Sequence, residues 1–135
     1  MKDPTGASMD CPCGRRLGRG IAPLRACCGP RLAGDEPAPD AEALMRSRYT
    51  AYVLGRSDYL RASWHAHTRP ASLALDPDVR WLGLEVKSHR QVGEDRAEVV
   101  FVARYRLAGR AVRMQECSRF VRENGSWFYV DGDVT

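Results

Sequence analysis

The sequence predicts an α+β protein in which a cysteine-rich segment precedes two helices and a curved four-stranded antiparallel sheet. Four of the five cysteines and no aromatic residue fall within residues 1–39. Apolar residues recur at helical spacing after Asp40, and four apolar runs separated by turn residues follow Val79. Helices grouped before a run of strands are typical of α+β folds, in which the helices cover one face of the sheet.

The overall composition is that of an ordinary globular protein. The 135 residues are 44% hydrophobic and 28% charged, which suits one domain with a short appended module. No run approaches the roughly 20 apolar residues that a membrane span needs, and residues 1–6 lack the apolar core of a secretory signal. We therefore expect a cytoplasmic protein without a membrane span, in which thiols stay reduced.

The cysteine spacing predicts a metal site. Cys11 and Cys13 are separated by one residue, and the adjacent Cys27 and Cys28 follow thirteen residues later. Zinc prefers four tetrahedral ligands and binds thiolates well. A disulfide pair or four free thiols are the alternatives, but a reducing compartment disfavours disulfides. We expect one structural Zn²⁺ per chain, because four cysteines leave no open position for water.

Zinc would also explain how the first part of the chain folds. A 39-residue segment without aromatic residues cannot build an apolar core, so metal binding would supply its folding free energy. Four thiolates and one dication would lower the formal net charge from +4 to +2. Most arginines are scattered, and only Arg15, Arg16 and Arg19 gather between the cysteine pairs. Binding of RNA or DNA by this loop is therefore a weaker expectation.

Residues 40–135 hold every aromatic residue and read as the larger domain, after a linker at residues 34–39. Asp40 is the expected N-cap of a helix that runs to about Leu54 and stops at Gly55. Its apolar stripe consists of Ala41, Leu44, Met45, Tyr49, Tyr52 and Val53. Arg48 falls inside this stripe, whereas Arg46, Ser47 and Thr50 face away from it.

A second, shorter helix and four strands should complete the domain. Ser57 is the expected cap of the second helix, which should end near His65. The expected strands cover residues 81–91, 96–107, 112–122 and 126–133. Asn124-Gly125 between the last two apolar runs is a strong hairpin signal.

Several motifs resemble those of a known family. The motifs are Cys11-Pro12-Cys13-Gly14, Cys27-Cys28-Gly29-Pro30, residues 41–49, 58–60, 64–65, 81–85 and 118–121, and the closing run 127–132. The cysteine motif resembles the SEC-C zinc motif, which also occurs at the C-terminus of the SecA translocation ATPase. The whole set resembles the YchJ-like family of uncharacterised bacterial proteins.

That resemblance implies a SEC-C segment followed by a cone-shaped domain similar to nuclear transport factor two. The usual SEC-C loop is shorter and continues Gly-Ser-Gly-Lys, whereas Arg15-Arg16-Leu17-Gly18 stands here. In SecA the motif docks a chaperone and contacts lipid or ribosome, which for this chain is an analogy.

Strand alternation predicts the lining of a pocket inside the cone. The candidate residues are Arg48, Tyr52, Tyr105, Glu116, Ser118, Tyr129 and Asp131. Arg48 could pair with Glu116 in this space. A packed core with a structural salt bridge is the alternative, since a register error of one residue would turn a whole face around.

No catalytic residues are predicted, because no group of side chains has the arrangement that a catalytic site requires. Asp131 and Glu116 are candidates for an acid–base pair, but their spacing in the sequence does not give their distance in space. We expect a non-enzymatic adaptor that contacts a protein or ribosomal partner through the zinc segment, with the larger domain as platform and a homodimer formed through the sheet. The alternative is a small-molecule binder or enzyme that works through the cone.

Overall fold

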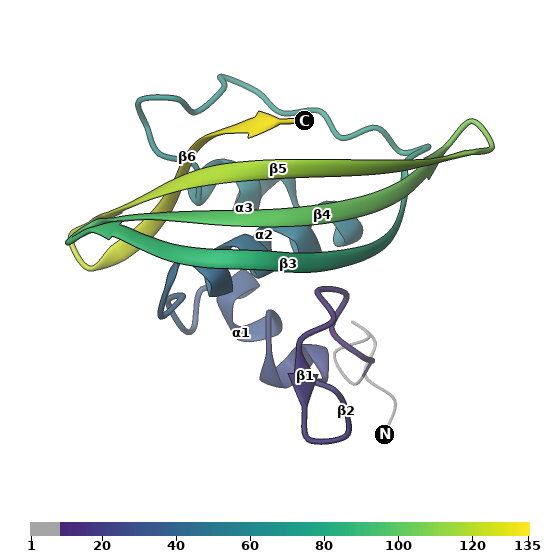
Figure 1. Cartoon of the computed structure of the whole chain (residues 1–135), viewed down its shortest axis with the longest axis horizontal. Helices are drawn as coiled ribbons and strands as arrows, with labels where there is room; N and C mark the ends of the chain where they lie inside the picture. Colours follow the sequence, from purple (N-terminus) through teal and green to yellow (C-terminus); the bar gives the residue numbers. More distant parts are fainter. Residues whose placement is uncertain (1–8) are drawn as a thin grey trace.

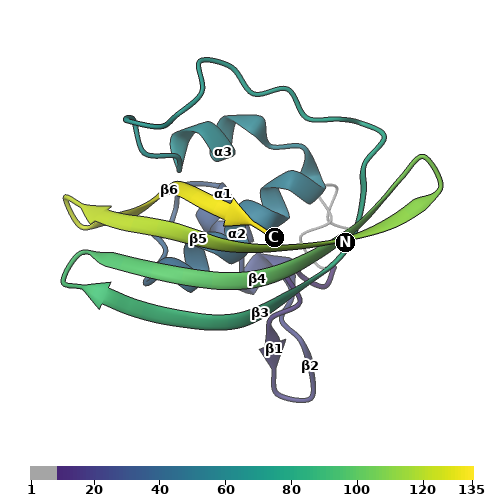
Figure 2. The ribbon, with the colours of Figure 1, turned by 45° about the horizontal axis from the view of Figure 1, so that its top comes forward.

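The computed structural model describes residues 9–135. Residues 1–6, which are not expected to form a secretory signal, lie outside the described part. Figure 1 shows a curved sheet with helices on one side and the cysteine-rich segment beyond its β3 edge. The turned view in Figure 2 shows the same layers, with a small hairpin projecting away from the sheet. The α+β architecture predicted from the sequence is confirmed.

Four antiparallel strands form the sheet in the order β3-β4-β5-β6. Their bounds are Arg80–Gly93 for β3, Arg96–Leu107 for β4, Arg110–Glu123 for β5 and Ser126–Val134 for β6. Each predicted strand lies within an observed one. The meander arises because each apolar run is followed by a tight turn that returns the chain beside the preceding strand.

Positive backbone angles set two of these turns. Asn124 and Gly125 have φ values of 52° and 80°, and Ala108 and Gly109 have 52° and 78°. A two-residue turn with φ positive at both positions has the twist that a hairpin needs. The Asn-Gly signal in the sequence therefore marks a real hairpin.

Bulges curve the sheet around the helices. The pairing of β3 with β4 shifts register between Trp81 and Gly83, between Val86 and Ser88, and near Gly93. Each extra residue bends its strand and increases the local twist. The result is a concave face that receives the helices.

Two helices, α2 over Ala41–Leu54 and α3 over Ser57–Ala62, lie on that face (Figure 2). The Asp40 side chain accepts a hydrogen bond from the Ala43 amide at 2.8 Å, and Gly55 ends α2 with φ 73°. Both predicted ends of α2 are therefore confirmed. Among residues 9–135, no helix is long and apolar enough to cross a membrane.

The prediction for α3 was wrong at both ends. Arg56 is the N-cap residue and no side chain caps this helix, which ends at Ala62 rather than near His65. The following residues bond to β6 instead: the Tyr129 amide donates to the Ser63 carbonyl at 2.9 Å, and the His65 amide to the Tyr129 carbonyl at 2.7 Å. These tertiary bonds compete with further helical turns.

The cysteine-rich segment consists of short elements. They are β1 at Arg16–Leu17, β2 at Gly20–Ile21, a 3-10 turn at Leu24–Ala26, and α1 at Gly29–Leu32. The cysteines and Leu24 belong to the same buried cluster as Leu44 of α2 and Val99 of β4. The linker at residues 34–39 forms no helix or strand. The division into residues 1–39 and 40–135 stays a prediction, since both sides contribute to one core.

Candidate functional site

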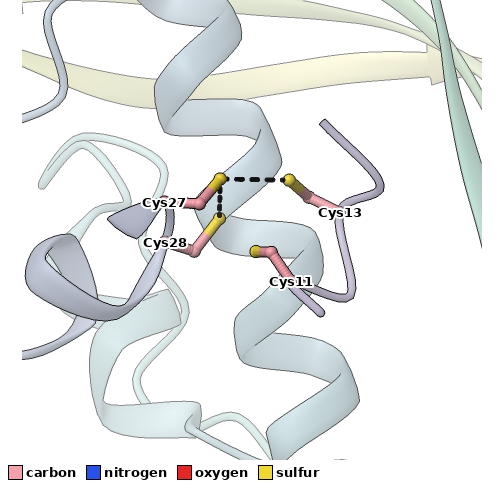
Figure 3. A group of neighbouring side chains, drawn as sticks. All are labelled: Cys11, Cys13, Cys27 and Cys28. Atoms are coloured by element: carbon pink, nitrogen blue, oxygen red, sulfur yellow. Dashed lines mark hydrogen bonds between the residues drawn. The ribbon is translucent and has the colours of Figure 1, made fainter. Parts of the chain in front are cut away.

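The four predicted metal ligands lie together. Figure 3 shows Cys11, Cys13, Cys27 and Cys28 pointing toward a common centre beside α2. Their sulfur atoms all lie within 4.8 Å of one another, and all four residues are buried. The Sγ atoms of Cys13 and Cys27 are 3.6 Å apart, and those of Cys27 and Cys28 are 3.9 Å apart.

These distances fit one tetrahedral metal ion. Zinc–sulfur bonds of about 2.3 Å place the sulfurs of a tetrahedral site about 3.8 Å apart. Four thiolates with no nitrogen or oxygen ligand form a soft donor set. The residues present therefore suit a closed, structural metal site.

Glycines let the chain bend at both cysteine pairs. Gly14 has φ 74°, and its amide donates to the Cys11 carbonyl at 3.0 Å. A side chain at Gly29 would place its Cβ 2.7 Å from the Leu24 carbonyl oxygen. Only glycine allows this close approach, which explains the glycine after each pair in the sequence.

The thiols influence one another strongly. Hydrogen bonds from the side chains of Cys13 and Cys28 lower the pKa of Cys11. A hydrogen bond from Cys28 is also the largest cause that lowers the pKa of Cys27, to about 6. The pKa of Cys28 is raised because its thiol donates to its neighbours and is buried. A hydrogen bond to Cys11 likewise raises the pKa of Cys13. The cluster thus holds two thiols with lowered pKa and two with raised pKa, and metal binding needs all four as thiolates.

The polar side of α2 is covered by the cysteine segment rather than by water. Arg46 Nη1 donates to the Cys13 carbonyl at 3.0 Å, and the Thr50 hydroxyl lies 3.7 Å from Cys11 Sγ. Ser47, which is fully buried, bonds to the Tyr59 hydroxyl at 2.7 Å. These residues do face away from the apolar stripe, as expected, but the sequence did not indicate their burial.

On the other side of α2, a cavity of about 220 Å³ lies between the helix and the sheet. Its lining is mostly apolar and aromatic, with three polar side chains. The lining residues are Met45, Arg48, Tyr49, Tyr52, Trp81, Phe101, Ala103, Met114, Glu116, Ser118, Phe120 and Tyr129. The cavity therefore has the composition common in small-molecule sites.

Arg48 is held in place at one wall of this cavity. It is only 6% exposed, and its Nη1 donates to the Leu60 carbonyl at 2.8 Å and to the Ser63 hydroxyl at 2.7 Å. Its guanidinium carbon lies 5.0 Å from the centre of the Trp64 ring and 4.4 Å from that of Tyr129. Burial lowers the pKa of Arg48, although an arginine stays charged in proteins.

Glu116 does not pair with Arg48, contrary to the pairing suggested from the sequence. Its Oε2 accepts hydrogen bonds from the Ser118 hydroxyl and, at 3.3 Å, from the Tyr129 hydroxyl. None of the ion pairs in the described residues joins Arg48 to Glu116. Tyr129 contacts both groups, Arg48 through its ring and Glu116 through its hydroxyl. Burial, followed by the nearby Glu116 charge, raises the pKa of Tyr129.

Two of the predicted pocket residues, Tyr105 and Asp131, do not line the cavity. The Tyr105 ring packs against Trp81, with 5.3 Å between ring centres, and Trp81 occupies the wall there. Asp131 is exposed and pairs with Arg119. The β5–β6 register shifts after Arg119, so that Tyr129 pairs with Phe120 and Asp131 with Arg119. This bulge turns Asp131 to the outer face and separates it from Glu116, which removes the acid–base pair considered above.

The outer face of the sheet carries a basic cluster that sequence reasoning missed. Arg104 of β4 lies directly opposite Arg113 of β5, and Arg106 opposite Arg80 of β3. All four side chains are exposed, and none joins an ion pair among residues 9–135. Strand pairing brings these arginines together although they are scattered along the chain. Arg104 and Arg106, at alternate positions of the second strand, were the available signal.

A four-cysteine segment followed by helices on a curved meander defines a SEC-C protein with a domain of the NTF2-like class. The chain belongs to the YchJ family, because residues 40–132 match the family's sequence model for the YchJ middle NTF2-like domain. A UPF0225 protein from Polaromonas naphthalenivorans is 59% identical, over 91% of this chain and 96% of its own. One from Xanthomonas campestris is 56% identical, over 95% of this chain and 97% of its own.

Solved structures agree with the fold. A SEC-C motif containing protein from Rhodopseudomonas palustris has a TM-score of 0.79 at 32% identity and covers 93% of this chain and 98% of its own. Another SEC-C motif containing protein, from Psychrobacter arcticus, has a TM-score of 0.81 at 26% identity. The match covers 96% of this chain and 85% of the Psychrobacter chain. The resemblance stated from the motifs is confirmed.

Proposed function

We propose that this protein is a cytoplasmic, non-enzymatic adaptor whose zinc-bound N-terminal segment contacts a protein partner. The observation that carries this proposal is the contrast between the buried cysteines and the loop that they enclose. Residues 16–21 lie between the two cysteine pairs and are exposed throughout. A closed metal site would fix both ends of this loop and so present its tip in one orientation.

Zinc is the metal that suits the site. Thiolates are soft ligands that select zinc over magnesium or calcium. With all four positions occupied by sulfur, the ion would have no place for water or substrate. The role proposed for Zn²⁺ is therefore structural, with one ion per chain.

The exposed tip suggests the chemistry of the partner. Leu17 is 55% exposed and Ile21 36% exposed, and Arg16 and Arg19 stand beside them. Apolar side chains flanked by guanidinium groups would fit a partner surface with an apolar centre and acidic rim. We refer to these four residues as the hairpin tip.

Site-specific photocrosslinking in cells tests this proposal. A photoreactive residue at Leu17 is compared with one at Val92, which is also apolar, exposed and near the end of a hairpin. A crosslinked partner specific to Leu17 that disappears in Cys27→Ser and in Arg16→Ser/Arg19→Ser is the expected result. Identical products from both positions, or an unchanged product in Cys27→Ser, would contradict the adaptor role.

A second candidate function, binding of RNA or the ribosome, is favoured by the outer-face arginines more than by the zinc loop. Like charges directly opposite in neighbouring strands destabilise a sheet, and a phosphate backbone would relieve that repulsion. Affinity for a single-stranded RNA should then fall steeply with salt, because bound phosphates release counterions. Arg104→Ser/Arg113→Ser should reduce the affinity and its salt dependence. If Arg16→Ser/Arg19→Ser reduces the RNA affinity and Arg104→Ser/Arg113→Ser does not, the zinc loop is the RNA-binding site.

The homodimer through the sheet stays a prediction. Light scattering after size-exclusion chromatography measures the mass directly, and a monomer at all concentrations tested would remove this expectation.

A further inference from the structure

The cavity beneath α2 has room for a small organic molecule. Its volume is about 220 Å³, whereas a buried cavity of about 150 Å³ is known to hold benzene. A branched aliphatic chain or a ring with a short polar group would therefore fill it. Aromatic and aliphatic side chains from α2, β3, β4 and β5 supply an apolar wall for such a body.

Arg48 supplies unused hydrogen-bond donors in the lining of this cavity. Its Nη1 makes both bonds to the protein, while Nε and Nη2 donate to no protein atom within residues 9–135. Burying a guanidinium without partners costs free energy. The bonds to Leu60 and Ser63 and the ring of Tyr129 fix its plane. A fixed guanidinium edge with free N–H groups is the usual partner of a carboxylate.

Glu116 supplies an unused acceptor in the same lining. Only its Oε2 accepts hydrogen bonds from the described residues, from Ser118 and Tyr129. Its Oε1 has no donor in that part of the chain. Since no ion pair joins Glu116 to Arg48, the two charges face one cavity separately rather than satisfying each other.

We propose that the cavity binds a small amino acid or hydroxy acid with an apolar side chain. The ligand's carboxylate accepts from Arg48, its amino or hydroxyl group donates to Glu116, and its side chain fills the apolar wall. This arrangement gives a partner to the buried Arg48 and to the free oxygen of the half-buried Glu116, which an apolar ligand could not do.

The charge and size of the cavity exclude other classes of ligand. A phosphate group would bring additional negative charge close to Glu116, and a nucleotide exceeds the volume of the cavity. A simple fatty acid would satisfy Arg48 and leave Oε1 of Glu116 without a donor. The cavity is separate from the hairpin tip. If the cavity binds no such ligand, the proposed adaptor role is unaffected.

Binding of three probes with one carbon skeleton tests the proposal. Leucine carries both polar groups, 4-methylpentanoate lacks the donor, and 3-methylbutylamine lacks the carboxylate. Titration at millimolar concentration, followed by two-dimensional NMR of the full chain, should shift signals of cavity residues most strongly with leucine. The two truncated probes should bind about tenfold more weakly or worse, because each loses a charge-assisted hydrogen bond.

Two variants sharpen the result. Glu116→Gln keeps the shape of the side chain and should weaken leucine binding about tenfold while sparing 4-methylpentanoate. Glu98→Gln on the same sheet is the matched control, because Glu98 pairs with the exposed Arg90 and does not line the cavity. No shift with either leucine or 2-hydroxy-4-methylpentanoate would overturn the proposal. Equal binding of all three probes, unchanged by Glu116→Gln, would also overturn it and leave only an apolar cavity.

Discussion

The guanidinium carbon of Arg48 lies 4.4 Å from the centre of the Tyr129 ring, whose hydroxyl donates to Glu116 at 3.3 Å. The tyrosine thus contacts the buried guanidinium with its ring and the half-buried carboxylate of Glu116 with its hydroxyl. A cation over an aromatic face is attracted to it, and a carboxylate is stabilised by a phenol donor. Both charged groups line the cavity and are held by the same tyrosine rather than by each other.

Arg48→Met should destabilise the fold by about 2–4 kcal/mol. It removes two buried hydrogen bonds and leaves the Leu60 carbonyl and Ser63 hydroxyl without this donor. Urea unfolding measures the loss. Arg90→Met is the control, because Arg90 is exposed and its pair with Glu98 should contribute about 1 kcal/mol or less. Equal stability of the two variants would show that Arg48 has no structural role.

Tyr129 and Glu116 should be energetically coupled. Tyr129→Phe removes the donor to the carboxylate while retaining the ring under Arg48, and should cost about 1 kcal/mol. A double-mutant cycle with Glu116→Gln isolates the interaction. We expect a coupling free energy of about 0.5 kcal/mol or more. A coupling near zero would mean that the 3.3 Å contact between hydroxyl and carboxylate does not persist in solution.

Metal removal should affect α2 as well as the cysteine segment. The Cys13 carbonyl and Cys11 sulfur contact Arg46 and Thr50 of that helix, so releasing the segment exposes its polar side. We expect chelation to lower the unfolding free energy by several kcal/mol. Hydrogen exchange should increase at residues 9–33 and in the first turns of α2. Faster exchange confined to residues 9–33 would instead indicate that the segment unfolds without disturbing the helix.

Stability should decrease at alkaline pH. Burial raises the pKa of Tyr49 to about 12, compared with about 10 in the unfolded chain. The folded state therefore holds this proton more tightly, and the resulting stability is complete below about pH 10 and is lost as the pH rises toward 12. Tyr49→Phe should make the unfolding free energy fall less steeply over this range. An unchanged slope would contradict the burial of that hydroxyl.

Local chemistry explains what could be predicted from the sequence. Asp40 and Gly55 bound α2 through bonds within a few residues, and Asn124-Gly125 sets its hairpin alone. The cysteine cluster is likewise local, because its four residues form two close pairs joined by one loop. Such features depend little on the rest of the molecule.

Features that depend on distant residues were not predictable in the same way. From the sequence alone, Ser47 and Thr50 are expected to face solvent. In the structure both are buried, Ser47 against Tyr59 of α3 and Thr50 against Cys11. The bulge at Val130 turns Asp131 outward, and Gly132 beside it does not by itself specify where the register shifts. The partners of Arg48 come from α3 and β6, whose register against α2 is a tertiary property. Strand alternation assigned most candidate pocket residues to the correct face of the sheet, but it could not predict which side chains they contact.

The zinc-bound cysteine cluster is the central claim, and native mass spectrometry tests it most directly. The full chain is purified from bacterial cytoplasm without chelator and compared with Cys27→Ser. The account predicts one zinc ion per chain in the unaltered protein and none in the variant. A metal-free unaltered chain, or equal zinc in both proteins, would contradict it.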